Sequence, residues 1–292
     1  MNSLPPELHT WMASGRFFNI DGLAVYCQQQ GTGPDLVCLH GFPTSCWDWQ
    51  RVLPHLARHF RVTVFDLPGY GLSEKPADRS YSLLRQMDVV AALLVELGIS
   101  DCHVLSHDMG DTVACEWLFR VAERQQVPAI NKLVMLNGGL YMDLHQPLLT
   151  QRLLRTPLLG EITARLSSWR VFMHQFPKVY ARPEQFSAAH YRAQWALLLH
   201  NDGRKVLAKI ACYMRERLRY KQRWLDTLHQ SALPVQLIWG QQDPIAVPAI
   251  AERLLRLRPQ TGLISLPEAA HYPQLEAPET VAMAVTDFLD SA

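Results

Sequence analysis

The chain has 292 residues, of which 48% are hydrophobic, so it is long enough to bury the core of one large domain. Its 28 Lys and Arg residues nearly balance 27 Asp and Glu residues, and the net charge is +1. This balance gives no reason to expect a nucleic acid or an anionic membrane as a partner.

The N-terminal residues show no basic segment followed by an apolar one, and no window approaches 18 continuous apolar residues. Neither a signal peptide nor a membrane span is predicted, so we expect a soluble, cytoplasmic protein. The six cysteines show no C-x-x-C spacing. Buried free thiols in a reducing compartment are therefore expected.

The elements predicted in chain order alternate between strand and helix. Residues 17–20 and 23–30 flank Asp21-Gly22 and predict an antiparallel hairpin. Short apolar runs predict buried strands at 36–39, 62–65, 102–105, 133–136, 235–239 and 263–266. Helical patterns such as 83–97 and 249–257 lie between them. This alternation predicts a mainly parallel sheet that is covered on both faces.

The alternation stops between residues 139 and 233. That stretch has a helical pattern rich in Leu, Arg and Trp, interrupted by prolines. We expect a helical cap at 139–233, inserted after the sixth strand of a core that comprises 1–138 and 234–292. Arginines cluster within 204–223, and we interpret them as a solvated helix face rather than a binding patch.

Residues 106–110 read Ser-His-Asp-Met-Gly and follow a predicted strand and precede a predicted helix. This is the context of a nucleophile elbow, with Asp108 at the position of the nucleophile. A carboxylate is already ionised at neutral pH. Its attack on an acyl carbon would give an anhydride, whereas attack on a saturated carbon gives an alkyl ester that water can cleave. The motif therefore predicts epoxide or alkyl halide substrates.

A second loop, His40-Gly41-Phe42-Pro43, follows the predicted strand 36–39. Gly41 allows close approach, so the backbone amide of Phe42 can point into the site. Together with the amide of Met109 it would form an oxyanion hole of two donors. We expect His40 and His107 to support these loops rather than to react.

Asp243 follows the predicted strand 235–239, and His271 follows the last strand. An aspartate at that position can orient a histidine and stabilise its cationic form. Either residue alone would be a weak signal. The order nucleophile, acid, histidine along the chain is that of the elbow fold.

These motifs resemble the α/β-hydrolase superfamily over the whole chain, in particular its branch with an Asp nucleophile, which holds epoxide hydrolases and haloalkane dehalogenases. More narrowly, the motifs at 40–45, 105–111, 137–139, 201–203 and 271–276 are similar to those of the mesoderm-specific transcript-like hydrolases. The resemblance implies an α/β-hydrolase fold: a mostly parallel eight-stranded sheet with helices on both faces and an inserted helical cap. It also implies Asp108 as nucleophile, with Asp243 and His271 as the pair that activates water.

The resemblance also bears on the leaving group. Haloalkane dehalogenases usually carry Trp after the nucleophile to hold the halide, but Met109 stands there. Epoxide hydrolases use cap tyrosines to donate to the epoxide oxygen. Tyr213 is the first candidate for this role, and Tyr141 and Tyr180 are others; each of them can equally be a core or rim residue.

We therefore expect an enzyme that opens epoxides to vicinal diols through an ester of Asp108, with no metal or organic cofactor. The expected partner is a small apolar epoxide or alkyl halide, not a nucleic acid or a membrane. A dehalogenase, or another hydrolase of saturated electrophilic carbons, is the alternative within the same class. A non-catalytic binding protein on a hydrolase scaffold is the alternative from another class. The oligomeric state and the natural substrate stay open.

Overall fold

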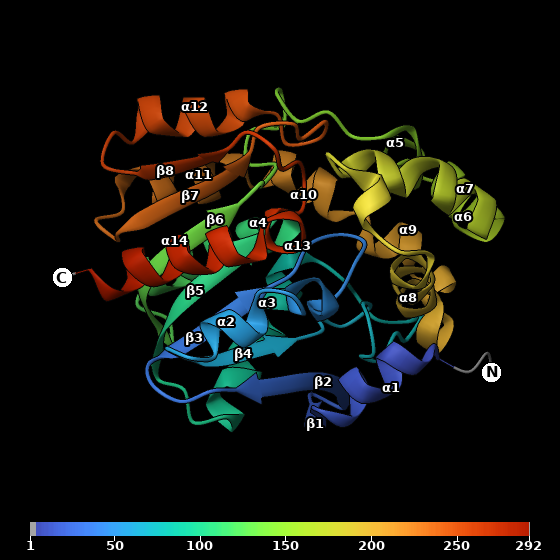
Figure 1. Cartoon of the computed structure of the whole chain (residues 1–292), viewed down its shortest axis with the longest axis horizontal. Helices are drawn as coiled ribbons and strands as arrows, with labels where there is room; N and C mark the ends of the chain where they lie inside the picture. The colour runs from blue at the N-terminus through green and yellow to red at the C-terminus, as the bar shows by residue number, and fades with distance from the viewer. Residues whose placement is uncertain (1–3, 292) are drawn as a thin grey trace.

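One eight-stranded sheet organises the molecule, as a computed structural model that describes residues 4–291 shows (Figure 1). The strand order is β1-β2-β4-β3-β5-β6-β7-β8. The strands are β1 (Arg16–Ile20), β2 (Leu23–Gln30), β3 (Asp35–Leu39), β4 (Arg61–Phe65), β5 (Asp101–His107), β6 (Ala129–Leu136), β7 (Val235–Gly240) and β8 (Gly262–Leu266).

The only antiparallel strands of this sheet are at its N-terminal edge. Strands β1 and β2 form the predicted hairpin, and β2 then pairs antiparallel with β4. Asp21 and Gly22 both have positive φ, 53° and 75°, which is the geometry that a two-residue turn between twisted strands requires. All the following pairs, from β4–β3 to β7–β8, are parallel. The predicted fold class is therefore confirmed.

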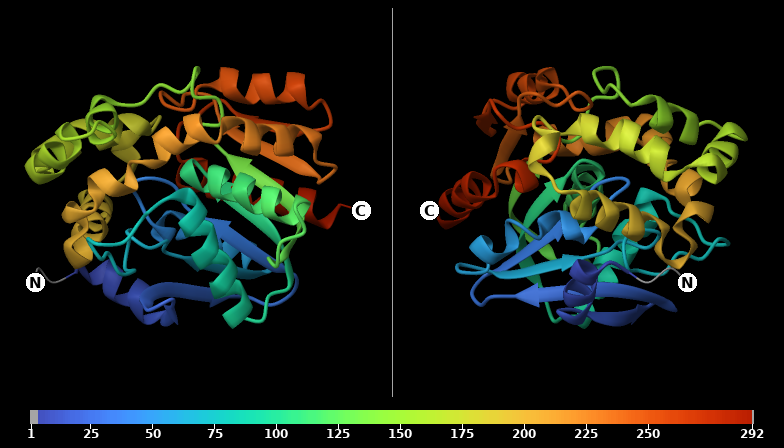
Figure 2. Two further views of the ribbon diagram at one scale, coloured as in Figure 1. Left: turned by 180° about the vertical axis from the view of Figure 1, so that it is seen from behind. Right: turned by 45° about the vertical axis from the view of Figure 1, so that its right-hand side comes forward.

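Helices cover both faces of the sheet. The core helices are α1 (Pro6–Ala13), α2 (Leu53–Leu56), α3 (Leu83–Glu96), α4 (Met109–Ala122), α12 (Pro248–Leu257), α13 (Pro273–Glu276) and α14 (Pro278–Asp290), with the 3₁₀ helix η1 at Cys46–Trp49. Helices α3, α4 and α12 contribute to one core cluster, and α1, α2 and α14 to the other. Seen from behind, α3 and α4 lie in front of the strands (Figure 2).

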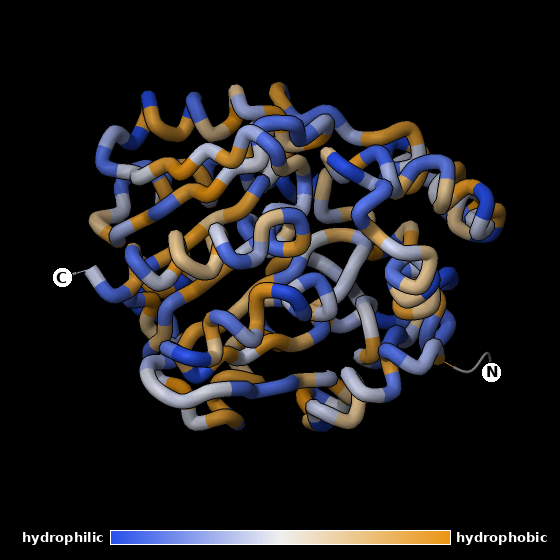
Figure 3. Tube along the Cα trace, viewed as in Figure 1, coloured by the Kyte–Doolittle hydropathy of each residue, from blue (hydrophilic) through white to orange (hydrophobic). Residues whose placement is uncertain are grey.

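The side chains of each strand alternate between these two cores because successive residues of a strand point to opposite faces. In β3, Val37 and Leu39 belong to the cluster on the α3 and α4 side, whereas Leu36 and Cys38 belong to the other. Burial on both faces explains why the central strands read as continuous apolar runs. The central strands are accordingly hydrophobic along their length (Figure 3).

A helical segment connects β6 to β7 and lies over one end of the sheet (Figures 1 and 2). Its helices are α5 (Leu149–Leu154), α6 (Leu159–Leu166), α7 (Trp169–Gln175), η2 (Phe176–Val179), η3 (Pro183–Gln185), α8 (Ala188–Leu199), η4 (His200–Lys205), α9 (Leu207–Ile210), α10 (Tyr213–Arg219) and α11 (Lys221–Gln230). We call this segment the cap. Helix α11 packs along α4 of the core, so the exact division of the chain into core and cap stays a prediction.

Within residues 4–291, no helix combines the length and the apolar character needed to cross a bilayer. All six cysteines are free thiols, and five of them are buried.

Candidate active site

Asp108 occupies the sharp turn between β5 and α4. Its backbone has φ 50° and ψ −107°, a strained conformation for a residue with a side chain, and such strain clusters at functional sites. A Cβ at Gly110 would collide with the backbone of Leu39 in the neighbouring strand. The small residue two positions after Asp108 is therefore required by the packing of the elbow against β3.

Two groups hold the buried carboxylate of Asp108. The amide of Phe42 donates to Oδ2 at 3.0 Å. Arg217 Nη2 lies 3.4 Å from Oδ1 and also donates to the carbonyl oxygen of Asp108 at 2.8 Å. Each carboxylate oxygen thus has its own partner, one from the core and one from the cap.

Neighbouring cationic groups stabilise the negative charge of Asp108. Burial alone would raise the pKa of its carboxyl group, but the Arg217 guanidinium and then the nearby His271 outweigh burial and leave the pKa below its usual value. Asp108 is therefore an anion at neutral pH, which is the state that the predicted nucleophile requires.

Arg217 corrects the interpretation of the arginine cluster within 204–223 as a solvated helix face. Arg215 and Arg219 are exposed, but Arg217 is only 3% exposed. Its Nε donates to Thr112 Oγ1 at 2.8 Å, and its guanidinium lies 4.7 Å from the centre of the Tyr213 ring. Periodicity within a short arginine-rich helix does not show which arginine faces inward, because the buried anion that attracts it lies 109 residues earlier.

The backbone of Gly139 leaves room for this arginine. A Cβ at that position would collide with Arg217 Nη1 and lie 2.6 Å from Cδ2 of His145. Both ring nitrogens of His145, and Nη1 of Arg217, are buried without a hydrogen-bond partner among the described residues. His145 was not predicted as a site residue, since no motif surrounds it.

Asp243 and His271 meet as predicted by their positions after β7 and β8. Asp243 Oδ2 lies 2.7 Å from Nδ1 of His271. The other oxygen, Oδ1, accepts from the amides of Ile245 and Ala246 at 2.7 and 3.0 Å. With so many donors, the carboxylate is fixed in orientation and presents one lone pair to the imidazole.

Asn137 is a site residue that the motif search did not assign. Its Nδ2 donates to Asp243 Oδ2 at 2.7 Å, and its Oδ1 accepts from the amide of Gly240 at 2.9 Å. It follows β6 directly and has a positive φ of 44°. Its place at the end of a predicted strand was the signal that could have found it.

His271 is electrostatically poised to carry a proton. Burial would lower its pKa, but the charge and hydrogen bond of Asp243, together with the charge of Asp108, raise the pKa to about 9. Because Asp108 contributes to this shift, the proton affinity of His271 depends on whether Asp108 is charged.

His40 and His107 hold loops, in line with the roles expected for them. His40 Nε2 accepts from the amide of Leu67 at 3.0 Å, so Nδ1 carries the proton that it donates to the Gly41 carbonyl at 2.9 Å. His107 Nε2 donates to the carbonyl oxygen of His271 at 2.7 Å. A Cβ at Gly41 would lie 2.7 Å from Cβ of Asp108, so this glycine permits the approach of the Phe42 loop.

Met109 begins α4, and its side chain is held by Tyr70, whose hydroxyl donates to the sulfur at 3.0 Å. Among the described residues, the backbone amide that donates a hydrogen bond to the Asp108 carboxylate is that of Phe42. A role of the Met109 amide in an oxyanion hole stays a prediction.

The three candidate tyrosines have different surroundings. Tyr213 packs against Phe42, with ring centres 5.3 Å apart, and its buried hydroxyl has no partner among the described residues. The hydroxyl of Tyr141 is 2.7 Å from His229 Nε2, and that of Tyr180 is 3.0 Å from His190 Nε2. The structure thus brings Tyr213 against Phe42, whose amide binds Asp108, and engages the hydroxyls of the other two elsewhere.

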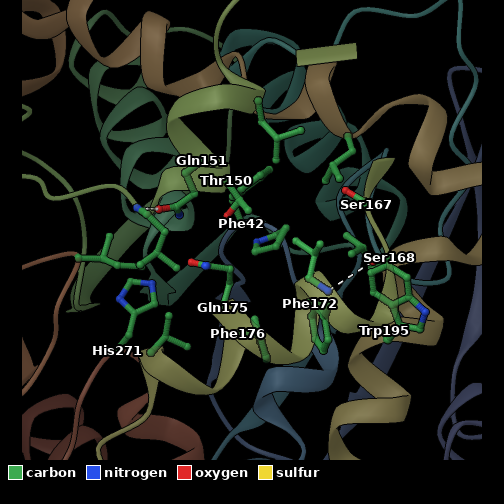
Figure 4. A pocket seen from close by; sticks show the side chains of 18 of the residues that line it. Phe42, Thr150, Gln151, Ser167, Ser168, Phe172, Gln175, Phe176, Trp195 and His271 are labelled. Atoms are coloured by element: carbon green, nitrogen blue, oxygen red, sulfur yellow. Dashed lines mark hydrogen bonds between the residues drawn. The ribbon is translucent and has the colours of Figure 1, made fainter. Parts of the chain in front are cut away.

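A cavity of about 90 Å³ lies between the cap and the sheet. Phe42, His271 and Tyr272 line it from the core, and residues of α5, α7, η2 and α8 line it from the cap. Figure 4 shows His271 and Phe42 in one pocket with the cap residues Gln151, Gln175 and Phe172. Most lining side chains are apolar, which suits a small apolar ligand. Among residues 4–291, no group of His, Cys, Asp or Glu is arranged to hold a metal ion.

The fold and the site define a hydrolase of the α/β-hydrolase type, in which the nucleophile, acid and histidine lie at the carboxyl ends of parallel strands. The chain belongs to the alpha/beta hydrolase fold family, whose sequence model matches residues 34–278.

Two relatives match almost the whole chain. The mesoderm-specific transcript homolog protein of Bos taurus is 35% identical, over 99% of this chain and 89% of that protein. The putative hydrolase LipZ of Mycobacterium tuberculosis is 34% identical, over 97% of this chain and 98% of that protein.

Two solved structures share the fold. Haloalkane dehalogenase DbeA from Bradyrhizobium elkani has a TM-score of 0.82 and 24% identity, over 94% of this chain and 97% of that chain. Epoxide hydrolase CorEH has a TM-score of 0.76 and 20% identity, over 94% of this chain and 98% of that chain. At these identities the likeness concerns the fold alone.

The burial of Arg217 can be tested through stability. Replacing Arg217 with Met leaves the buried Asp108 anion without its partner, so we expect the free energy of unfolding to fall by about 3–5 kcal/mol. Arg215→Met, on the same helix but exposed, should change it by less than about 0.5 kcal/mol. Denaturant unfolding measures both values. Small, equal effects would mean that Arg217 is solvated and does not hold Asp108.

Proposed function

We propose that this hydrolase opens epoxides to vicinal diols through a covalent ester of Asp108. The observation that carries the proposal is the pairing of an ionised carboxylate with an unpartnered, fully buried tyrosine hydroxyl. Buried polar groups normally have partners. The Tyr213 ring packs against Phe42 and Arg217, which both contact Asp108. Its free hydroxyl is therefore suited to a bound ligand, and a proton donor there suits an oxygen that develops negative charge.

In the first half-reaction, Oδ1 of Asp108 attacks an epoxide carbon. The carbon–oxygen bond of the ring breaks, and the oxygen takes the proton of the Tyr213 hydroxyl, which leaves a hydroxyalkyl ester and a tyrosinate. Burial, followed by the charge of Asp108, raises the pKa of Tyr213, so the hydroxyl is protonated when the substrate binds. Arg217, beside both groups, stabilises the anion that is left on the tyrosine.

In the second half-reaction, His271 takes a proton from water, and the resulting hydroxide attacks the carbonyl carbon of the ester. Oδ2, which the Phe42 amide already binds at 3.0 Å, becomes the oxyanion without leaving its donor. The diol departs with the proton from His271, and the proton of the regenerated carboxyl group restores Tyr213. Esterification supports this step because it removes the charge of Asp108, which otherwise holds a proton on His271.

One observation favours the alternative of a dehalogenase. Arg217 Nη1 is a buried cationic donor without a partner among the described residues, and such a donor near the nucleophile could hold a departing halide. The side chain of Met109 offers no such donor. The two reactions share the ester and differ in whether the leaving group needs a proton.

The covalent intermediate can be trapped with His271→Gln, which removes the base but keeps the nucleophile. We expect the mass of the protein to rise by the intact mass of an epoxide substrate, with the adduct on the peptide that contains Asp108. Peptide mass spectrometry measures both. The matched control is Asp108→Asn in the His271→Gln background, which should form no adduct. An adduct elsewhere, or none with any epoxide or alkyl bromide, would favour the non-catalytic scaffold.

The two half-reactions should differ in pH dependence. Ester formation needs the Asp108 anion, whose pKa is lowered, so its rate should be level between about pH 5 and pH 8. Ester hydrolysis needs neutral His271, so its rate should rise with pH. Its midpoint should lie below the value of about 9 that the charged Asp108 sustains. Single-turnover kinetics separates the two steps; a hydrolysis rate that is independent of pH over this range would exclude His271 as the base.

Tyr213→Phe tests the class of leaving group. Loss of the hydroxyl should slow ester formation from an epoxide by about 10²–10⁴-fold, the usual effect of a positioned acid. Ester formation from an alkyl bromide, which needs no proton, should change far less. Tyr141→Phe and Tyr180→Phe remove hydroxyls engaged by His229 and His190 and serve as controls. Equal, small losses with both substrates would make Tyr213 a packing residue and contradict epoxide opening.

A further inference from the structure

We propose that the outer face of the cap docks on the surface of an anionic phospholipid bilayer. The docking face consists of an apolar ridge, formed by Leu158 at the N-cap of α6 and by Ile162 and Leu166 on that helix, and a basic groove beside it. This inference is independent of the chemistry proposed for Asp108, because none of the ridge residues lines the cavity that contains His271.

The ridge is a concentration of exposed apolar side chains that the fold itself does not use. Of the eleven large hydrophobic residues that are exposed in the described part of the chain, six lie between residues 149 and 171. Leu158 is 85% exposed, Leu166 72% and Ile162 53%. Ile162 and Leu166 are four residues apart and so share one side of the helix, and Leu158 is the N-cap residue directly before it. The opposite side of α6 is already packed, through Gly160 and Ala164.

A groove of about 650 Å³ runs beside the ridge. Six basic residues and two acidic ones line it: Arg155, Arg165, Arg204, Lys205, Lys209, Arg215, Glu161 and Asp202. Of these, only Lys205 and Asp202 form an ion pair within residues 4–291. Outside this pair, four arginines and Lys209 face one acidic residue, Glu161. This excess of positive charge lies next to apolar side chains, which is the composition of a segment that lies at a membrane interface.

The charge of the whole chain is also unevenly distributed, with an excess of basic residues in the cap. Between residues 139 and 233 there are 15 Lys and Arg against 6 Asp and Glu, whereas the full chain has 28 against 27. The remaining residues therefore carry 13 against 21. The net charge of +1, from which no membrane partner was expected, conceals a strongly basic cap and an acidic core. An anionic surface would attract the cap and repel the core, and so would orient the molecule with α6 toward the lipid.

The docking face leads to the substrate cavity. Leu154 lines both the groove and the cavity, and Ser167, next to the ridge residue Leu166, also lines the cavity. Figure 1 shows α6 and α7 at the outer end of the cap. Insertion of the ridge among acyl chains would place the rim of the cavity at the lipid surface, and an apolar substrate could enter from the bilayer.

A lipid surface fits this face better than a second copy of the chain. A stable protein interface needs a broad, complementary surface of about 800 Å² on each partner. Here three separate apolar side chains project from a short helix and its N-cap, and the arginines of the groove lie beside them. Arginine side chains can place their alkyl parts among lipids while the guanidinium groups reach the phosphates.

The test is cosedimentation of the full chain with vesicles of phosphatidylcholine alone and with about one quarter phosphatidylglycerol. We expect binding to the anionic vesicles that weakens when ionic strength rises from about 0.05 M to about 0.5 M. The triple variant Leu158→Ser, Ile162→Ser, Leu166→Ser should bind at least about tenfold more weakly. The triple variant Arg155→Gln, Arg165→Gln, Arg215→Gln should lose a similar factor.

The matched control is Val95→Ser with Met283→Ser, which removes two comparably exposed apolar side chains from core helices and should bind like the parent chain. Thermal unfolding and turnover of a water-soluble substrate, both expected to be unchanged, show that each variant is folded. The proposal is overturned if the parent chain does not bind anionic vesicles at low salt. It is also overturned if the triple serine variant of the ridge binds as the parent does. It is equally overturned if the parent chain self-associates through this face, so that the serine variant is monomeric and neither binds vesicles.

Discussion

The structure around the elbow depends on keeping one carboxylate ionised where water does not reach it. Moving a carboxylate into an apolar interior is unfavourable by several kcal/mol unless other groups compensate for the lost hydration. Asp108 has this compensation from two directions. The Phe42 amide comes from the core and binds Oδ2, whereas the Arg217 guanidinium comes from the cap and lies beside Oδ1. Gly41 and Gly139 are small because these two groups must approach so closely.

The same charge links the two halves of the proposed reaction. While Asp108 is an anion, it helps to hold a proton on His271, and the imidazole is then no base. An ester at Asp108 carries no charge, so the proton affinity of His271 falls before the second half-reaction, in which the imidazole acts as the base. Asp243 remains charged throughout and keeps the imidazole oriented, since Asn137 and two backbone amides fix its carboxylate. No movement of the chain is required for this change.

Whether a site residue could be predicted from the sequence depended on the element that positions it. The elbow, the Phe42 loop, Asp243 and His271 all follow predicted strands, and parallel strands bring their carboxyl ends together at one edge of the sheet. Each strand was recognisable from an apolar run of its own. Arg217, in contrast, is placed by the packing of the cap on α4, which no local pattern encodes. The same applies to the tyrosines, because helical periodicity does not distinguish the side of a cap helix that faces the nucleophile.

Tyr213 and Arg217 lie on the same short helix, α10, four residues apart. Any displacement of α10 from the elbow would remove the proposed acid and the countercharge together. Asp108 would then have lost its main electrostatic stabilisation, but water admitted by the displacement would hydrate it instead. The carboxylate of Asp108, the proposed nucleophile, is therefore shielded from water and paired with Arg217 only while α10 packs against the elbow. Arg215 of the same helix lines the basic groove on the outside of the cap, so the proposed lipid-docking face and the proposed acid share α10.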